Sequence, residues 1–282
     1  YNDFKSYISY TLYIGACFSL NPKTMTSEKI FAIALMFLLP FISVLVPILV
    51  GQFYGNYRKK KSEDVQQAPV GAVVGAAFGL LAFMLAITFQ IAANRFDARK
   101  QLLLEEVTNI RTAYLRAGLI PEPYRSSTKK YLVEYVDLRV DLATDLSKLD
   151  AGLSRSQQIL DSLWKYTEAL AEQDRSSEVY AMYTTSVNDM VDAYNQRIAV
   201  ALQYRIPPAV LFVLFIISFV SMLLLGYQFG ISGKGSLKLI ILLSVIFAIV
   251  MFLILALDQP EKGLATVSQK PMIYLQQQLR GK

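Results

Sequence analysis

The chain has 282 residues, of which 54% are hydrophobic, and a formal net charge of +6. It contains no His and a single Cys, Cys17, which excludes a Cys/His metal site, histidine acid–base catalysis and a disulfide within one chain. Between Asn94 and Arg205 there are 15 basic and 16 acidic residues, so the excess positive charge lies near the apolar stretches. That distribution is typical of membrane anchors and argues against nucleic-acid binding.

The N-terminal segment, residues 1–29, interleaves tyrosines with apolar residues, which predicts a helix lying in the membrane interface. The chain begins at Tyr1 rather than Met, and we expect that an initiator or leader segment has been removed. A short basic loop, residues 51–69, is expected between the first two membrane spans.

Four apolar segments are long enough to cross a bilayer as helices, because a span needs roughly 20 residues. These segments are residues 30–50, 70–93, 207–230 and 237–257. They contain almost no charged residues. The sequence therefore predicts an all-α integral membrane protein with four transmembrane helices, whose main partner is the lipid bilayer.

The second span carries Gly71, Gly75 and Gly79 at four-residue spacing. Small residues at this spacing allow another helix to approach closely. The pattern predicts helix packing, either within one chain or between subunits.

Residues 94–206 predict an extramembrane four-helix bundle inserted between the second and third spans, because apolar side chains recur there at three- and four-residue steps. Its first helix is expected to continue from the second span without a break. Gly152 is expected to end its second helix, and its last helix is expected to reach Pro207. A C-terminal segment, residues 258–282, follows the fourth span.

Four crossings place both termini and the inserted domain on one side of the membrane. The opposite side holds Arg58–Lys61, Lys234 and Lys238. Positive charge in short loops marks the cytoplasmic face, which predicts an extracytoplasmic domain. Arg95 and Arg99, beside the second span, favour the reverse orientation.

The sequence contains no phosphate-binding loop, nucleophile elbow or dinucleotide fingerprint, so we expect no enzyme, no metal and no cofactor. The carboxylate pair Glu105–Glu106 is interpreted as part of a solvated helix face. If the protein forms a pore, the second span supplies its lining. The candidates for a constriction and its mouth are Phe78, Leu85, Phe89, Gln90, Asn94 and Arg95.

Several short sequence motifs between Val70 and Leu275 occur in a combination that is specific enough to compare with known families. They are Phe78–Ala86, Asn94–Arg99, Leu103–Glu106, Tyr114–Ala117, Pro121–Arg125, Glu134–Arg139, Leu257–Pro260, Gly263, Val267–Gln269 and Pro271. Together they resemble the bacterial bestrophin-like membrane protein family. The resemblance implies four spans, a helical insertion and a bacterial inner-membrane location. Bestrophins themselves are pentameric anion channels with a cytoplasmic helical domain, although their Trp-rich signature is missing here.

Two hypotheses follow. The first is a homo-oligomeric ion channel, permeable to anions, with the second span along its axis. The second is a non-conducting membrane scaffold, sensor or accessory subunit of a larger complex, whose bundle binds a partner protein.

Overall fold

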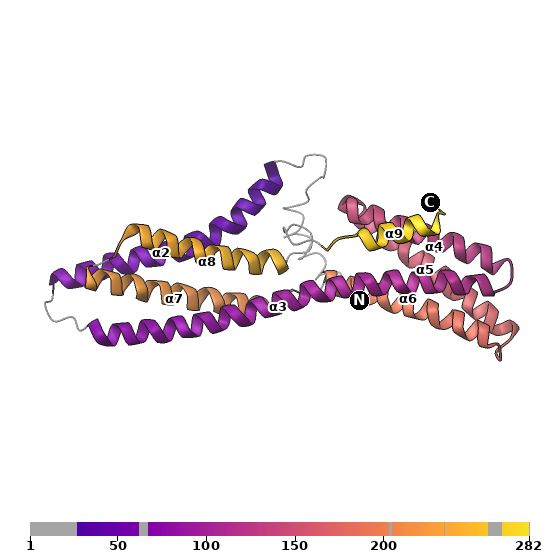
Figure 1. Ribbon diagram of the computed structural model, residues 1–282, viewed down its shortest axis with the longest axis horizontal. Coiled ribbons are helices and arrows are strands. Elements are labelled where there is room, and N and C mark those ends of the chain that lie inside the picture. The colour runs from indigo at the N-terminus through magenta and orange to yellow at the C-terminus, as the bar shows by residue number, and fades with distance from the viewer. Residues whose placement is uncertain (1–26, 62–66, 203–204, 234, 259–266, 282) are drawn as a thin grey trace. The chain divides into compact units, whose positions relative to one another are not determined.

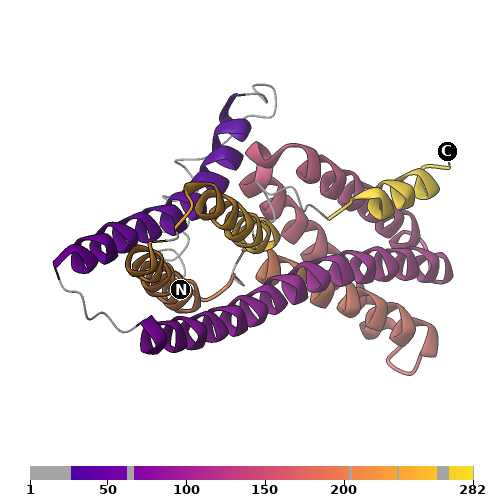
Figure 2. The same cartoon turned by 60° about the vertical axis from the view of Figure 1, so that its left-hand side comes forward.

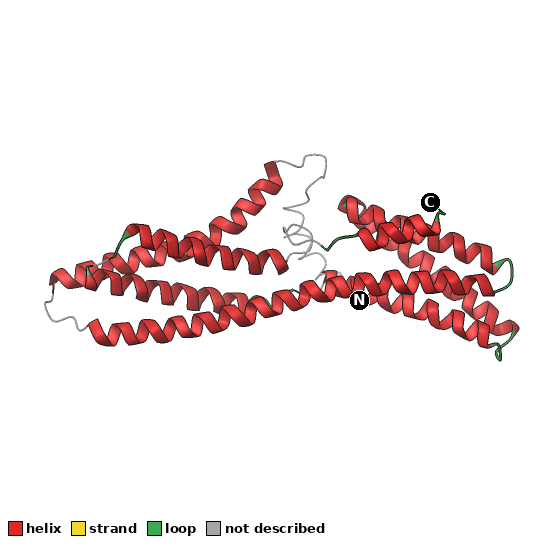
Figure 3. Ribbon diagram, in the orientation of Figure 1, coloured by secondary structure: helices red, strands yellow, loops and turns green. Residues whose placement is uncertain are grey.

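The computed structural model describes residues 27–61, 67–202, 205–233, 235–258 and 267–281. Helices and their connecting turns account for all of these residues, with no strand among them (Figure 3). The interfacial helix expected in residues 1–29 falls outside the described part, apart from the last three residues, which begin the first helix. The chain divides into two compact units, which we describe separately.

The first unit, here called the membrane unit, comprises residues 30–98 and 200–267. Four of its helices are long and apolar enough to cross a membrane, which confirms the predicted number of spans. They are α2 (Ser27–Lys61), α3 (Gln67–Arg116), α7 (Pro208–Ser232) and α8 (Leu237–Asp258). The loop expected at residues 51–69 is shorter than predicted, because α2 stays helical as far as Lys61.

All four membrane helices contribute to one apolar core. Its fully buried members are Val44 and Ile48 of α2, Leu81 of α3, Leu214 and Met222 of α7, and Ile240 and Met251 of α8. In both views α7 lies between α2 and α3 (Figure 1 and Figure 2). The Ser221 hydroxyl of α7 adds a 3.3 Å hydrogen bond to the carbonyl of Ala77 in α3.

The second unit, here called the bundle unit, includes residues 99–199 and 268–282. It contains the C-terminal part of α3 together with four further helices (Figure 1). These are α4 (Tyr124–Thr144), α5 (Leu149–Gln173), α6 (Glu178–Leu202) and α9 (Lys270–Leu279). The predicted four-helix insertion is thus present. The C-terminal helix α9 packs on α4, which the sequence did not indicate.

The continuity of α3 confirms that one helix runs from the second span into the inserted domain. No Pro or Gly interrupts the chain between Leu80 and Arg116, so nothing breaks its hydrogen-bond ladder. The helix ends in a short 3-10 turn, Ala117–Leu119. Ile120 is then extended, as expected for a residue that precedes proline.

Two helix ends differ from the prediction. Gly152 does not end a helix but lies buried inside α5, where a Cβ would come within 2.4 Å of Leu142 Cδ2. The turn before α5 is made instead by Asp145, whose carboxylate accepts a hydrogen bond from the Ser147 amide at 3.1 Å. At the other boundary, α6 ends at Leu202 and does not reach Pro207.

Four glycines let α2 and α7 pack closely in the membrane unit. An added Cβ would lie 2.1 Å from Leu223 O at Gly51 and 2.4 Å from Tyr227 O at Gly55. At Gly226 and Gly230, the corresponding distances to backbone oxygens of α2 are 2.0 and 2.5 Å. Backbone therefore lies against backbone, and only glycine fits.

We expect Gly226→Ala to destabilise the protein, because its new methyl group would overlap the Ile48 carbonyl and force the two helices apart. Overpacking of this kind costs about 1–3 kcal/mol, more than the roughly 1 kcal/mol of helix propensity that alanine gains. Thermal denaturation in detergent, followed by circular dichroism, measures the effect. Gly118→Ala is the control, since its nearest neighbour is the Lys129 side-chain tip at 3.9 Å. Equal melting temperatures for the two variants would contradict the expectation.

Candidate functional site

The membrane part of α3 is the least covered of the four spans. In the most apolar 18-residue stretch of each span, 11% of the residues are buried in α3, compared with 28% in α2 and α7 and 33% in α8. Leu80 and Phe83 remain 52% and 62% exposed. One broad face of α3 therefore has no partner among the described residues of this chain.

The glycines predicted to pack lie towards this open face. Gly75 and Gly79 have no described atom within 4 Å of an added Cβ, while at Gly71 the nearest is Gln228 Nε2 at 3.3 Å. Close packing within the chain uses the glycines of α2 and α7 instead. The packing of another helix on Gly71, Gly75 and Gly79 stays a prediction, now for a partner outside the chain.

Two amide side chains lie one helical turn apart on the exposed part of α3. Gln90 and Asn94 are both exposed, and Gln90 Nε2 donates a 2.6 Å hydrogen bond to Asn94 Oδ1. Thr88 differs from them, since its buried hydroxyl donates back to the Met84 carbonyl at 2.7 Å. The amide pair therefore presents its remaining donors and acceptor lone pairs outwards.

The other pore candidates do not share the face of this pair. Phe78 and Leu85 pack against the core of the membrane unit, and Phe78 makes an edge-to-face contact with Phe247 of α8. Phe89 is 39% exposed, and Arg95 is partly buried. Helical spacing places Phe78, Leu85 and Phe89 on a stripe separate from Gln90 and Asn94. A constriction built by this stripe stays a prediction.

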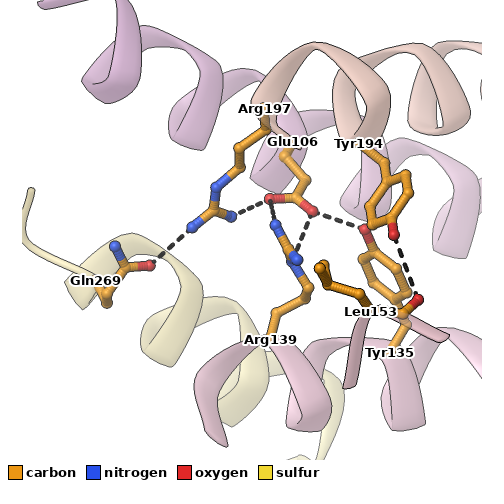
Figure 4. Close-up of polar contacts among 7 residues, drawn as sticks. All are labelled: Glu106, Tyr135, Arg139, Leu153, Tyr194, Arg197 and Gln269. Atoms are coloured by element: carbon orange, nitrogen blue, oxygen red, sulfur yellow. Dashed lines mark hydrogen bonds and ion pairs between the residues drawn. The ribbon is translucent and has the colours of Figure 1, made fainter. Parts of the chain in front are cut away.

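The bundle unit holds a buried charge cluster centred on Glu106 of α3 (Figure 4). The Glu106 side chain is fully buried and forms ion pairs with Arg139 of α4, at 3.0 Å, and with Arg197 of α6. The Tyr135 hydroxyl donates a 2.7 Å hydrogen bond to the same carboxylate. Three helices thus meet at one carboxyl group.

The electrostatics of this cluster favour a charged carboxylate. Burial by itself raises the pKa of Glu106, but the guanidinium groups of Arg139 and Arg197 and the Tyr135 hydroxyl outweigh it and lower the pKa below 4.5. Burial, followed by the Glu106 charge, raises the pKa of Tyr135 well above its ordinary value. The phenol therefore stays protonated and acts as a donor.

Further contacts extend the cluster to the C-terminal segment. Arg197 Nη2 donates a 3.1 Å hydrogen bond to Gln269 Oε1, and Tyr194 donates to the Leu153 carbonyl at 3.3 Å (Figure 4). The Arg139 guanidinium lies 5.6 Å from the ring centre of Tyr194, a cation–π contact. Glu106, Arg197 and Gln269 belong to three different segments through which the chain passes between its two units.

The interpretation of Glu105–Glu106 as a solvated pair was wrong for Glu106, which is buried, and right for Glu105, which is exposed. Helical spacing carried a signal, since Glu106 shares a face with buried Leu103 and Ile110. The family resemblance also included Glu106, Arg139 and Gln269, but gave them no role. The described residues contain no group of three or more His, Cys, Asp or Glu side chains suited to a metal ion.

Comparison with known proteins gives the family. The model of the bestrophin-like domain matches residues 37–272, so the chain belongs to the bestrophin-like family. No curated protein matches the sequence.

Solved structures of a bacterial bestrophin homologue from Klebsiella pneumoniae share the fold. One variant superposes with a TM-score of 0.58 at 16% identity, covering 91% of this chain and all of the other. A second has a TM-score of 0.61 at 16% identity, covering 87% and 98%. A third has a TM-score of 0.59 at 18% identity, covering 90% and 98%.

We expect Glu106→Gln to destabilise the bundle unit by about 3–5 kcal/mol, because it leaves two largely buried guanidinium groups without their counter-charge. Trp164, the only tryptophan, lies in α5, so its fluorescence during urea unfolding reports on this unit. The matched control is Glu105→Gln, an exposed neighbour expected to change stability by less than about 0.5 kcal/mol. Similar unfolding midpoints for the two variants would contradict a central role for Glu106.

The stability contributed by Glu106 should also depend on pH. Its pKa is lowered in the folded state, so the contribution is complete above the ordinary value of 4.5 and is lost as the pH falls through the folded-state pKa. We expect the difference in unfolding free energy between the wild type and Glu106→Gln to be constant from about pH 8 to 6 and to shrink at acid pH, where the carboxyl is protonated. Trp164 fluorescence measures it. A difference that is the same at every pH would refute the assignment.

Proposed function

We propose that the protein is a homo-oligomeric membrane channel for anions, in which the open face of α3 is turned towards the axis shared by the subunits. The observation that carries the proposal is the pairing of an uncovered span with an exposed amide pair. Gln90 and Asn94 lie on the helix that the rest of the chain covers least.

Lipid is a poor neighbour for this face. Gln90 and Asn94 lie at the bundle-side end of the predicted span, and there they favour water or another helix over lipid, because an unpaired polar group costs several kcal/mol in hydrocarbon. The glycines Gly75 and Gly79 leave room for a close neighbour along the same helix. A ring of copies supplies both, namely helix contacts along α3 and a polar path beside the amides.

The charges of α3 favour anions. Between Gln67 and Phe96 the helix contains no Asp or Glu, and its first charged residue is Arg95. Amide N–H groups at Gln90 and Asn94 are donors that can replace part of the hydration shell of an anion. Membership of the bestrophin-like family supports a channel, and we propose the bacterial inner membrane as its location, with the bundle unit outside the cytoplasm.

A second candidate function rests on the surface of the bundle unit. Leu115 and Leu119 are 64% and 60% exposed, and Tyr274 of α9 is 62% exposed. Exposed apolar groups of this size, when they lie close together, mark binding surfaces for other proteins. They favour a non-conducting scaffold or accessory subunit that holds a partner protein at the membrane.

The decisive experiment combines native mass measurement in detergent with chloride flux into liposomes. We expect a closed ring of identical subunits that passes chloride in preference to sodium. Asn94→Asp places a negative charge on the proposed path and should lower the chloride-to-sodium permeability ratio at least about tenfold, since like charges repel at close range. The matched control is Gln277→Glu, an exposed site on α9 with the same change of charge.

A monomer without flux, or a stoichiometric complex with another protein, would favour the scaffold. A conducting ring whose selectivity is the same in Asn94→Asp and the control would keep the channel but remove α3 from its lining.

A further inference from the structure

The two sides of α2 have different surroundings. One side packs on α7 through Ile48, Gly51 and Gly55, which recur at three- and four-residue steps. One turn further along the same side, Lys59 Nζ lies beside Gly233, within 2.6 Å of where its Cβ would be. Gly233 is the left-handed cap that ends α7, so Lys59 lies at the negative end of that helix.

The opposite side of α2 is exposed over several turns. Val46, Val50, Phe53 and Tyr57 are 47%, 53%, 77% and 55% exposed. They recur at the three- and four-residue steps of one helix face, and the stripe ends in Lys60–Lys61, which are also exposed. No described part of the chain covers this stripe.

The order of side chains along the stripe follows the order of groups in a phospholipid leaflet. Aliphatic residues come first, then the aromatic rings, and finally two ammonium groups. From Val46 to Tyr57 the helix rises roughly 16 Å, about half the thickness of a 30 Å hydrocarbon core. Aromatic rings concentrate at the membrane–water boundary, which places Lys60 and Lys61 at the level of the headgroups.

Charge complementarity identifies the kind of lipid. Four basic residues lie in the last turn of α2, and two acidic residues, Glu63 and Asp64, follow in the sequence. Lys59 is turned towards α7, and helical spacing places Arg58 about 100° away from Tyr57, so Lys60 and Lys61 are the two cations on the exposed stripe. Each basic residue close to an anionic membrane surface strengthens binding by about 1 kcal/mol, a factor of about five.

We propose that the stripe Val46–Val50–Phe53–Tyr57–Lys60–Lys61 is a binding site for an anionic phospholipid. Lys60 and Lys61 bind its phosphate, Tyr57 lies beside the glycerol region, and Phe53, Val50 and Val46 contact an acyl chain. This site lies outside the proposed permeation path and does not depend on whether the protein conducts.

The test is a titration of the purified full chain, in neutral detergent, with fluorescent phosphatidylglycerol. We expect Lys60→Gln/Lys61→Gln to weaken binding at least about tenfold. Lys130→Gln/Lys165→Gln removes the same charge from exposed sites on α4 and α5 and should leave the affinity unchanged. Lys59→Gln should also keep the affinity, because its ammonium group faces α7.

Two comparisons identify the source of the phosphate. Phosphatidylcholine, which has no net charge, should bind at least about tenfold more weakly than phosphatidylglycerol. Soluble glycerol phosphate should not compete, because it lacks the acyl chains that contact the apolar part of the stripe. An equal loss in the bundle control, equal binding of phosphatidylcholine, or full competition by glycerol phosphate would each overturn the proposal.

Discussion

Three helices of the bundle unit meet at one buried carboxylate. Among the described residues, Glu106 is the only acidic ion-pair partner of Arg139 and Arg197, so removing its charge leaves two cations in a poorly solvated place. Its neighbours come from α3, α4 and α6, and Gln269 joins through Arg197. The cluster therefore joins α3, α6 and the segment of Gln269, the three parts of the bundle unit at which the chain leaves for the membrane unit or returns from it.

Glycines do two different things in the membrane unit. On α2 and α7 they bring two backbones together, with added Cβ atoms only 2.0–2.5 Å from carbonyl oxygens. On α3 the same four-residue spacing leaves open space at Gly75 and Gly79. One pattern therefore closes the fold within the chain, and the other leaves open space that no described residue fills. The open space agrees with the low coverage of α3, which still contributes Leu81 to the common core.

Hydropathy predicted the four spans and the uninterrupted α3, because lipid requires long apolar helices and no Pro or Gly occurs between Leu80 and Arg116. It could not show which glycines pack within the chain, since Gly51 and Gly226 look the same in sequence as Gly75. Glu106 was also missed, because a carboxylate on an amphipathic helix is usually solvated, and its partners Arg139 and Arg197 are far away in sequence. Long-range pairing of charges has no periodic signature, whereas apolar burial has one.

Polar groups along α3 have two kinds of surroundings. Glu106 is neutralised and hydrogen-bonded entirely within the chain, whereas Gln90 and Asn94 bond to one another and still face outwards. Both amides lie at the bundle-side end of the predicted span, and no other described side chain bonds to them. The buried carboxylate of the bundle part is therefore satisfied within one chain, whereas the amide pair is left to water or to a second helix. The proposed channel would surround the amide pair with water, whereas the alternative scaffold would cover it with a helix of its partner.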